Sequence, residues 1–269
     1  LKSGGYAATC RAIIYLFADM EQNVEFTHCY YLTAGEAGAQ SSMPLTLLVQ
    51  RVIEVATEHA NALGIGYATL SVHGIAWVLS KISIEMQRYP DINEDYCLTT
   101  WIESYNRRFC DRCFAVTGGD GQPIGYIRTM WTAIDVERRC VADLTAFERD
   151  AFPVSSRSCP VAKPVRLPAL PADASVQDYT FKYCDIDFNR HVNSVRYLAL
   201  VLNHWPLDHF DHNTIRRIDI CYHHECHFGQ TVQLRVASQG HESECEIVHD
   251  GVRAVGLRIS WALRAVTAR

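Results

Sequence analysis

The sequence has no excess of positive charge, no long apolar run and little glycine or proline. Its 25 lysines and arginines against 30 aspartates and glutamates give a net charge of −5, which argues against broad binding to a nucleic acid backbone. The apolar stretch at residues 13–18 is far shorter than the roughly 20 residues that a membrane-spanning helix needs. Fifteen glycines and nine prolines, with 48% hydrophobic residues, exclude a fibrous or disordered chain and favour a globular protein.

Cysteine is abundant instead, with eleven residues. The chain is long enough to fold without a disulfide framework and shows no secretory signal, so we expect a cytoplasmic protein with mostly buried thiols. One C-x-x-C, Cys110 to Cys113, lies in a predicted strand, where a zinc or redox site is the less favoured alternative. The sequence starts at Leu1 and Met20 precedes the first predicted strand, so we expect residues 1–19 to be a non-native or disordered leader.

Five of the nine prolines lie between Pro153 and Pro171. Because proline fixes φ and has no amide hydrogen, this composition predicts an extended linker over residues 153–174. It separates an N-terminal half, residues 20–152, from a C-terminal half, residues 175–269.

Both halves show the same predicted order of a strand, a helix and four strands. In the first half the ranges are 24–32 for the strand, 44–63 for the helix, and 72–88, 95–107, 109–117 and 122–136 for the later strands. In the second half they are 177–184, then 192–205 for the helix, and 214–226, 230–238, 241–249 and 252–263. A sheet with one apolar face needs a helix to cover it. The repeat therefore predicts an α+β fold of the tandem hot-dog type, in which each antiparallel sheet wraps around a central helix.

The richest polar segment, Asp185 to Asn193, lies between a predicted strand and a predicted helix. Asp187, Asn189 and His191 alternate, so an extended turn points all three side chains to one side. The free amides at the start of the helix favour negative charge beside them. A carboxylate, an amide and an imidazole in that place suit acyl transfer. The alternative is a capped helix, in which these side chains satisfy turn amides, and Asn193 fits that alternative well.

A second polar segment runs from Cys221 to His227. Its density of cysteine and histidine suggests zinc, but only every second strand residue could share an ion, and we predict no metal site. We expect Glu225 to supply a second carboxylate, as a general base beside His191. Cys226 is a candidate nucleophile. Consecutive residues of a strand point to opposite faces, so at most one of Glu225 and Cys226 faces the site.

Arginines occur in short groups: Arg107–Arg108 with Arg112, Arg138–Arg139 and Arg216–Arg217. Solvated strand ends are the simpler interpretation of such groups. The alternative is a local docking patch for an acidic partner.

Several motifs resemble those of one enzyme family. The run D-F-N-R-H-V-N at residues 187–193 and the run Y-H-H-E-C at residues 222–226 look like the catalytic segment of acyl-[acyl-carrier-protein] thioesterases. In the first half, W-V-L-S-K at residues 77–81 and T-W at residues 100–101 are similar to strands of that family. His223 and His224 stand where plant members commonly have arginine. The resemblance covers residues 24 to 263.

The resemblance implies a double hot-dog hydrolase of fatty acid biosynthesis that releases free fatty acids from acyl carrier protein (ACP), without a metal or an organic cofactor. Residue by residue, the family's catalytic set corresponds to Asp187, Asn189, His191 and Glu225 in this sequence. Asp187 either attacks the thioester carbonyl or serves as the base for water. The N-terminal half is implied to bind the acyl chain, with Trp77 as a substrate-binding candidate, although large aromatic residues in strands are usually core residues.

Acyl-loaded ACP is the implied partner, and we expect no nucleic acid partner and no stable membrane association. A homodimer and the preferred chain length stay open. Two other functions also stay open: a hot-dog thioesterase that acts on acyl-coenzyme A or aryl-coenzyme A, and an acyl-binding protein without turnover.

Overall fold

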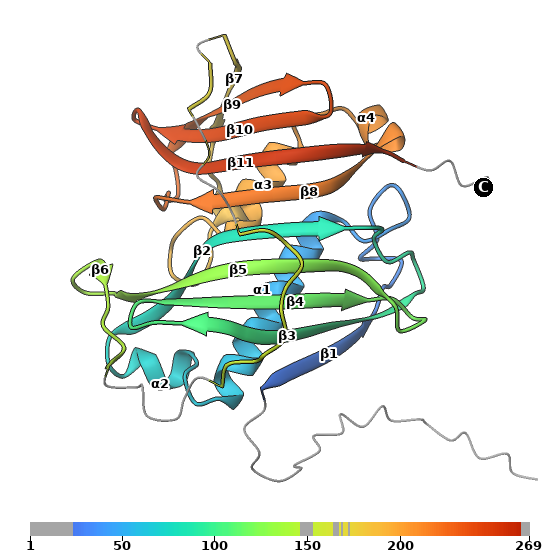
Figure 1. The fold of residues 1–269 in the computed structure, drawn as a ribbon. Helices are drawn as coiled ribbons and strands as arrows, with labels where there is room; N and C mark the ends of the chain where they lie inside the picture. Colours follow the sequence, from blue (N-terminus) through green and yellow to red (C-terminus); the bar gives the residue numbers. More distant parts are fainter. Residues whose placement is uncertain (1–23, 146–152, 164–166, 168, 172, 265–269) are drawn as a thin grey trace, which may run out of the picture.

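The computed structural model describes residues 24–145, 153–163, 167, 169–171 and 173–264, so the expected leader at residues 1–19 lies outside the described residues. The strands form one antiparallel sheet in the order β1-β3-β4-β5-β2-β8-β11-β10-β9-β7, with β6 paired to β5. Helices α1 and α3 lie together against one side of this sheet (Figure 1). None of the described helices is long and apolar enough to cross a membrane.

In the N-terminal half the order is β1, α1, α2 and then five strands. The bounds are β1 Glu25–Tyr31, α1 Leu45–Ala62, α2 Tyr67–Ser71, β2 Ile75–Met86, β3 Asp95–Tyr105, β4 Phe109–Thr117, β5 Pro123–Asp135 and β6 Cys140–Val141. Helix α1 begins directly after Pro44 and ends before Gly64, whose φ of +72° suits glycine. Its apolar face, which includes Leu48 and Val52, is fully buried against the sheet. The predicted helix and strands are confirmed here, while α2 and β6 were not predicted.

In the C-terminal half the bounds are β7 Ser175–Thr180, η2 Tyr183–Asp185, α3 Ser194–Leu202, α4 Leu207–His212, β8 Asn213–Tyr222, β9 Thr231–Gln239, β10 Glu242–His249 and β11 Val252–Leu263. The predicted strand–helix–four-strand order is therefore confirmed a second time, with α4 as an unpredicted addition. The halves join where β2 pairs with β8, from Lys81 opposite Cys221 to Glu85 opposite Arg217. This is the α+β tandem hot-dog architecture predicted from the sequence. The exact domain boundaries stay a prediction, because the two halves share one sheet.

Residues 153–163 of the proline-rich segment pack on the outer face of the N-terminal strands, where Figure 1 shows them crossing β3, β4 and β5. Its Val154 forms a parallel bridge with Ile102. Cys159 and Val161 are buried against Trp101, which is fully buried. The segment therefore covers apolar sheet surface that an unattached linker would leave exposed.

Cys29 and Cys97 form a disulfide across the β1–β3 ladder, where they are direct partners. The sequence predicts mostly buried thiols, and this one bond departs from that expectation. Six of the eight free cysteines among the described residues are buried, as expected. Disulfides are rare in reducing compartments, so this bond argues against the cytoplasmic location expected from the sequence. That location stays a prediction.

We predict that the Cys29→Ser, Cys97→Ser double variant unfolds with a free energy about 2–4 kcal/mol lower than that of the parent chain, because the bond closes a long loop in the unfolded state. Urea unfolding of the oxidised parent, the reduced parent and the variant measures this. Equal stability of all three proteins would mean that the bond contributes nothing.

Candidate active site

One cavity of about 770 Å³ is lined by both halves of the chain. The N-terminal half contributes mainly apolar and aromatic side chains from α1, α2, β2 and β5, including Trp77 and Trp131. The C-terminal half contributes the polar loop before α3, the start of α3 and the residues after β8. A mostly apolar hollow of this size with a few polar groups at one side is typical of a small-molecule site.

Asp187 organises the loop between η2 and α3. Its backbone N–H donates to the carbonyl of His191 at 2.8 Å, and its Oδ1 accepts from the amides of Asn189 at 2.9 Å and His191 at 3.2 Å. Arg190 takes a φ of +69° to close this turn. The loop is a tight turn rather than the extended one expected. Asp187, Asn189 and His191 nevertheless line the same cavity.

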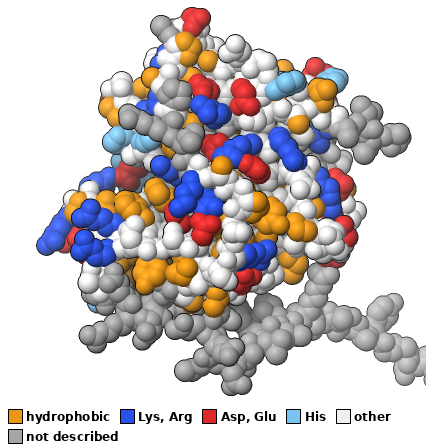
Figure 2. Space-filling model, viewed as in Figure 1, with side chains coloured by type: hydrophobic (Ala, Val, Ile, Leu, Met, Phe, Trp, Pro, Cys, Tyr) orange, Lys and Arg blue, Asp and Glu red, His pale blue; other side chains and the backbone are white. Residues whose placement is uncertain are grey.

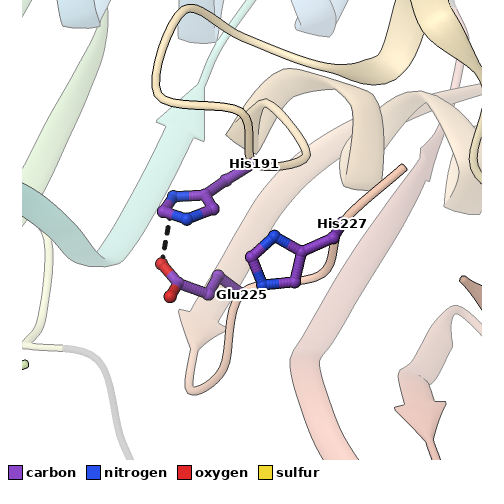
Figure 3. Close-up of side chains that lie close together, drawn as sticks. All are labelled: His191, Glu225 and His227. Carbon is purple, nitrogen blue, oxygen red and sulfur yellow. Dashed lines mark ion pairs between the residues drawn. The ribbon is translucent and has the colours of Figure 1, made fainter.

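Glu225 lies beside His191, with 3.1 Å between Glu225 Oε2 and His191 Nδ1 (Figure 3). Its other oxygen, Oε1, forms an ion pair with Arg139, which comes from the β5–β6 turn of the other half. The side chains of His191 and Glu225 are about one-third exposed, so the pair is open to the cavity and to solvent. The predicted approach of Glu225 to His191 is therefore found, and Arg139 is an unpredicted third member.

The pKa of His191 lies below its usual range. Burial is the main cause, and the nearby His227 and Arg139 add to it, while Asp187 opposes it. Arg139 neutralises the Glu225 carboxylate that would otherwise stabilise an imidazolium. The lowered pKa favours the neutral imidazole.

Asn193 is the N-cap of α3, and its side chain accepts from the amide of Val195 at 2.9 Å. The helix starts at Ser194 and not at Val192 as expected, because Val192 pairs with Ile186 in a β-bridge and Asn193 keeps an extended backbone with a ψ of 137°. The capping interpretation is therefore confirmed for Asn193. The amide of Ser194, at the first helical position, has no acceptor within the helix, and Ser194 lines the cavity.

Cys226 points away from the cavity. Its side chain is 1% exposed and belongs to the main core, and burial raises the pKa of its thiol. Its amide donates to the hydroxyl of Tyr197 at 2.8 Å. The expectation that at most one of Glu225 and Cys226 faces the site is confirmed, and Glu225 is that residue.

The aromatic and C-x-x-C candidates divide between the two faces of the sheet. Trp77 lines the cavity, and its indole N–H donates to the carbonyl of Ile65 at 3.0 Å. Trp101 lies on the opposite face under the proline-rich segment. Cys110 lines the cavity whereas Cys113 packs beside Trp101, so this C-x-x-C cannot hold one ion between its sulfurs.

Several of the cavity-lining residues were not assigned to the site from the sequence. Arg112, expected at a solvated strand end or a docking patch, is buried and approaches His59 Nδ1 at 2.6 Å. Tyr67 and Phe188 form an edge-to-face ring pair that joins the two halves, at 5.8 Å between ring centroids. Arg139 was visible only as part of an arginine pair. No local signal links it to Glu225, because that contact spans the two halves.

A larger hollow of about 1120 Å³ lies on the outer face of the sheet, lined by Lys163, Arg217 and Glu244 among others. Figure 2 shows basic and acidic side chains interleaved over this face. Ion pairs such as Arg258 with Glu244 occupy its charges. None of the site residues predicted from the sequence lines it.

Comparison with known proteins finds matches to both halves of the chain. Residues 23–147 match the acyl-ACP thioesterase N-terminal domain, and residues 169–262 match the acyl-ACP thioesterase C-terminal domain. The crystal structure of an acyl-ACP thioesterase from Bacteroides thetaiotaomicron superimposes with a TM-score of 0.84 at 29% identity, over 90% of this chain and 99% of that one.

Curated relatives include an oleoyl-acyl carrier protein thioesterase of Arabidopsis thaliana, 25% identical over 82% of this chain and 65% of the relative. A palmitoyl-acyl carrier protein thioesterase of Gossypium hirsutum is 22% identical over 77% of this chain and 53% of the relative. The chain thus spans about half to two thirds of the length of these relatives. Because the two domain matches together cover most of its length, the chain belongs to the acyl-ACP thioesterase family.

Proposed function

We propose that this protein hydrolyses the thioester of a fatty acyl-ACP and releases the free fatty acid. Supporting this are the family membership and one observation in particular: Asp187, Asn189, His191 and Glu225 line the polar side of a cavity whose other walls are mostly apolar. In hydrolysis a water oxygen bonds to the acyl carbon, the carbon–sulfur bond breaks, and the departing thiolate takes up a proton. A thioester is reactive enough for carboxylate and imidazole groups to carry this reaction.

Asp187 is proposed to act on the thioester carbon, either by direct attack or as the base that activates water. Its Oδ1 is occupied by two turn amides, so this role falls to Oδ2. Asn189 and His191 position the carboxylate and the thioester. Glu225, held by Arg139, orients or deprotonates the hydrolytic water.

The amide of Ser194 is the proposed donor to the carbonyl oxygen as it gains negative charge. It lies at the start of α3, where the helix dipole also favours an anion. The other amides of the turn are less suited, because those of residues 189 to 193 already donate to protein acceptors. The sequence predicts several free amides at the helix start that favour negative charge. In this proposal the amide of Ser194 alone takes that role.

The acyl chain is proposed to lie along α1 and β2, past Trp77. Ala56 and Ala60 of α1 line this part of the cavity and leave room that larger side chains would fill. Each buried methylene of a fatty chain contributes about 0.8 kcal/mol. In this proposal the N-terminal half binds the acyl chain and the C-terminal half binds the thioester, which explains why residues of both halves line the cavity.

The assay that tests the function uses purified protein with acyl-ACP and measures free fatty acid, with acyl-coenzyme A as the comparison substrate. We expect a higher kcat/KM on acyl-ACP. A preference for acyl-coenzyme A would favour the alternative thioesterase, and binding without turnover would favour an acyl-binding protein.

Carrier docking is proposed at the end of the sheet near β6, where Figure 2 shows basic side chains gathered. Arg107, Arg108 and Arg138 are exposed there. Among the described residues, the ion pairs of Arg107 with Asp143 and of Arg138 with Asp135 are long, at 3.8 and 3.9 Å. Arg139 of the same turn borders the cavity. By contrast, Arg217 forms ion pairs with Asp219 and Glu85, so the Arg216–Arg217 pair is less suited to binding an acidic partner.

We predict that the Arg107→Glu, Arg138→Glu double variant lowers kcat/KM for acyl-ACP by about tenfold or more, because it reverses two charges that attract an acidic partner. An uncharged acyl-pantetheine thioester should be hydrolysed at the parental rate. Equal losses on both substrates would place the effect in the cavity and contradict docking at this surface.

A further inference from the structure

Three metal-ligating side chains meet beside the cavity: His191, Glu225 and His227 (Figure 3). One ligand atom from each lies within 4.8 Å of the other two. His191 Nδ1 and Glu225 Oε2 are 3.1 Å apart, and the two imidazole rings have centroids 4.9 Å apart. A tetrahedral Zn²⁺ ion with ligand bonds near 2.0–2.2 Å holds its donor atoms about 3.3 Å apart. One pair already meets this spacing, and the His227 ligand atom must approach by at most about 1.5 Å, within reach of a side-chain rotation.

The backbone presents these side chains together. His191 and His227 are partners in an antiparallel β-bridge, which places their side chains as neighbours. Glu225 precedes His227 by two residues in the loop between β8 and β9, and its Oε2 faces His191. The amide of His227 is also fixed, since it donates to the side chain of Gln230 at 2.9 Å.

We propose that His191, Glu225 and His227 form a binding site for a divalent transition-metal ion of the Zn²⁺ class, and that the bound ion inhibits the enzyme. The ion takes the place of the hydrogen between His191 Nδ1 and Glu225 Oε2, and His191 binds it through the Nδ1 lone pair as a neutral imidazole whose one ring proton lies on Nε2. The inhibition, though not the binding, rests on the proposed function, because the ion occupies two side chains on which hydrolysis depends.

The donor set selects the kind of ion. Two imidazoles and one carboxylate suit Zn²⁺, Ni²⁺ and Cu²⁺, whereas Mg²⁺ and Ca²⁺ prefer oxygen ligands. Arg139 on Glu225 Oε1 offsets the only carboxylate charge of the trio, so binding depends mainly on the two imidazole nitrogens, which suit ions of the Zn²⁺ class. It also orients the carboxylate so that Oε2 points toward the histidines, as outer partners of metal ligands commonly do.

Direct metal binding tests the proposal without any turnover. Co²⁺ is titrated into the full-length Cys140→Ser, Cys184→Ser variant, which removes the two exposed described thiols, and ligand-field absorption is recorded. Zn²⁺ should displace one Co²⁺ per chain, and Mg²⁺ should not. We expect His227→Gln in this background to weaken binding by about tenfold or more. His241→Gln, which removes an exposed histidine of the β9–β10 turn, should bind as before.

Inhibition is measured on the same proteins, each normalised to its own metal-free rate. The Zn²⁺ concentration for half inhibition should rise about tenfold or more in His227→Gln and stay unchanged in His241→Gln. Equal Co²⁺ affinity in the parent and His227→Gln, or no binding by the parent, would overturn the site. Binding at the site with full activity retained would overturn the inhibition. A chain that binds Co²⁺ through His227 and hydrolyses no thioester would instead contradict the proposed function alone.

Discussion

Asp187→Asn is expected to lower kcat on acyl-ACP by about a thousandfold while leaving the fold intact. Asparagine keeps the side-chain oxygen that accepts from the amides of Asn189 and His191, so the turn survives. It removes the negative charge that attacks the thioester or activates water, and positioned acid–base groups typically contribute 10²–10⁴-fold. Steady-state kinetics with acyl-ACP and a thermal unfolding curve give the two readouts.

Asp120→Asn is the matched control. Asp120 also accepts from a turn amide two residues later, that of Gln122, but it lies in the β4–β5 turn and lines neither cavity. It should keep its parental kcat. Asp187→Ala should lose activity and, in addition, unfold at a lower temperature, because two turn amides lose their acceptor. A fully active Asp187→Asn beside an inactive Asp187→Ala would reduce Asp187 to a turn-capping residue.

Glu225→Gln is expected to lower kcat by about a hundredfold, with a smaller change in KM. The substitution removes the carboxylate beside His191 and leaves the Arg139 guanidinium without its counter-ion. Water at the thioester then lacks the group proposed to orient or deprotonate it. The measurement is again kcat and KM on acyl-ACP.

Glu244→Gln is the corresponding control, since Glu244 pairs with Arg258 in the outer hollow and should not affect turnover. The Asp187→Asn, Glu225→Gln double variant adds a further test. If both carboxylates serve one step, its loss should be smaller than the product of the two single losses. Parental kcat in Glu225→Gln would remove Glu225 from the chemistry.

Much of the fold is predictable because the spacing of hydrophobic residues differs between helices and strands. Helix α1 repeats apolar residues every three or four positions, and the strands alternate, so both appear as local patterns. The start of α3 differs from the expectation because Val192 is held in extended backbone, by a β-bridge to Ile186 and by its amide bond to the carbonyl of the distant Cys226. The end of β8 differs for a similar reason: the amides of His223 and His224 both donate to the carbonyl of Ala254, which ends the regular ladder.

The site is predictable only in part. The composition of the 187–193 segment indicates chemistry, and motif spacing joins it to Glu225. The Arg139–Glu225 ion pair and the His191–His227 bridge depend on how distant segments pack, which no local pattern contains. The left-handed Arg190, which turns the loop, is likewise invisible in the residue types around it.

The most direct measurement is a crystal structure of the protein with an acyl-ACP analogue in which a methylene replaces the thioester sulfur. We predict that the ketone carbon lies about 3–3.5 Å from an Asp187 carboxylate oxygen, with its oxygen toward the Ser194 amide and the acyl chain in the 770 Å³ cavity beside Trp77. An analogue bound with its chain outside that cavity, or with its carbonyl out of contact with Asp187, would contradict the account.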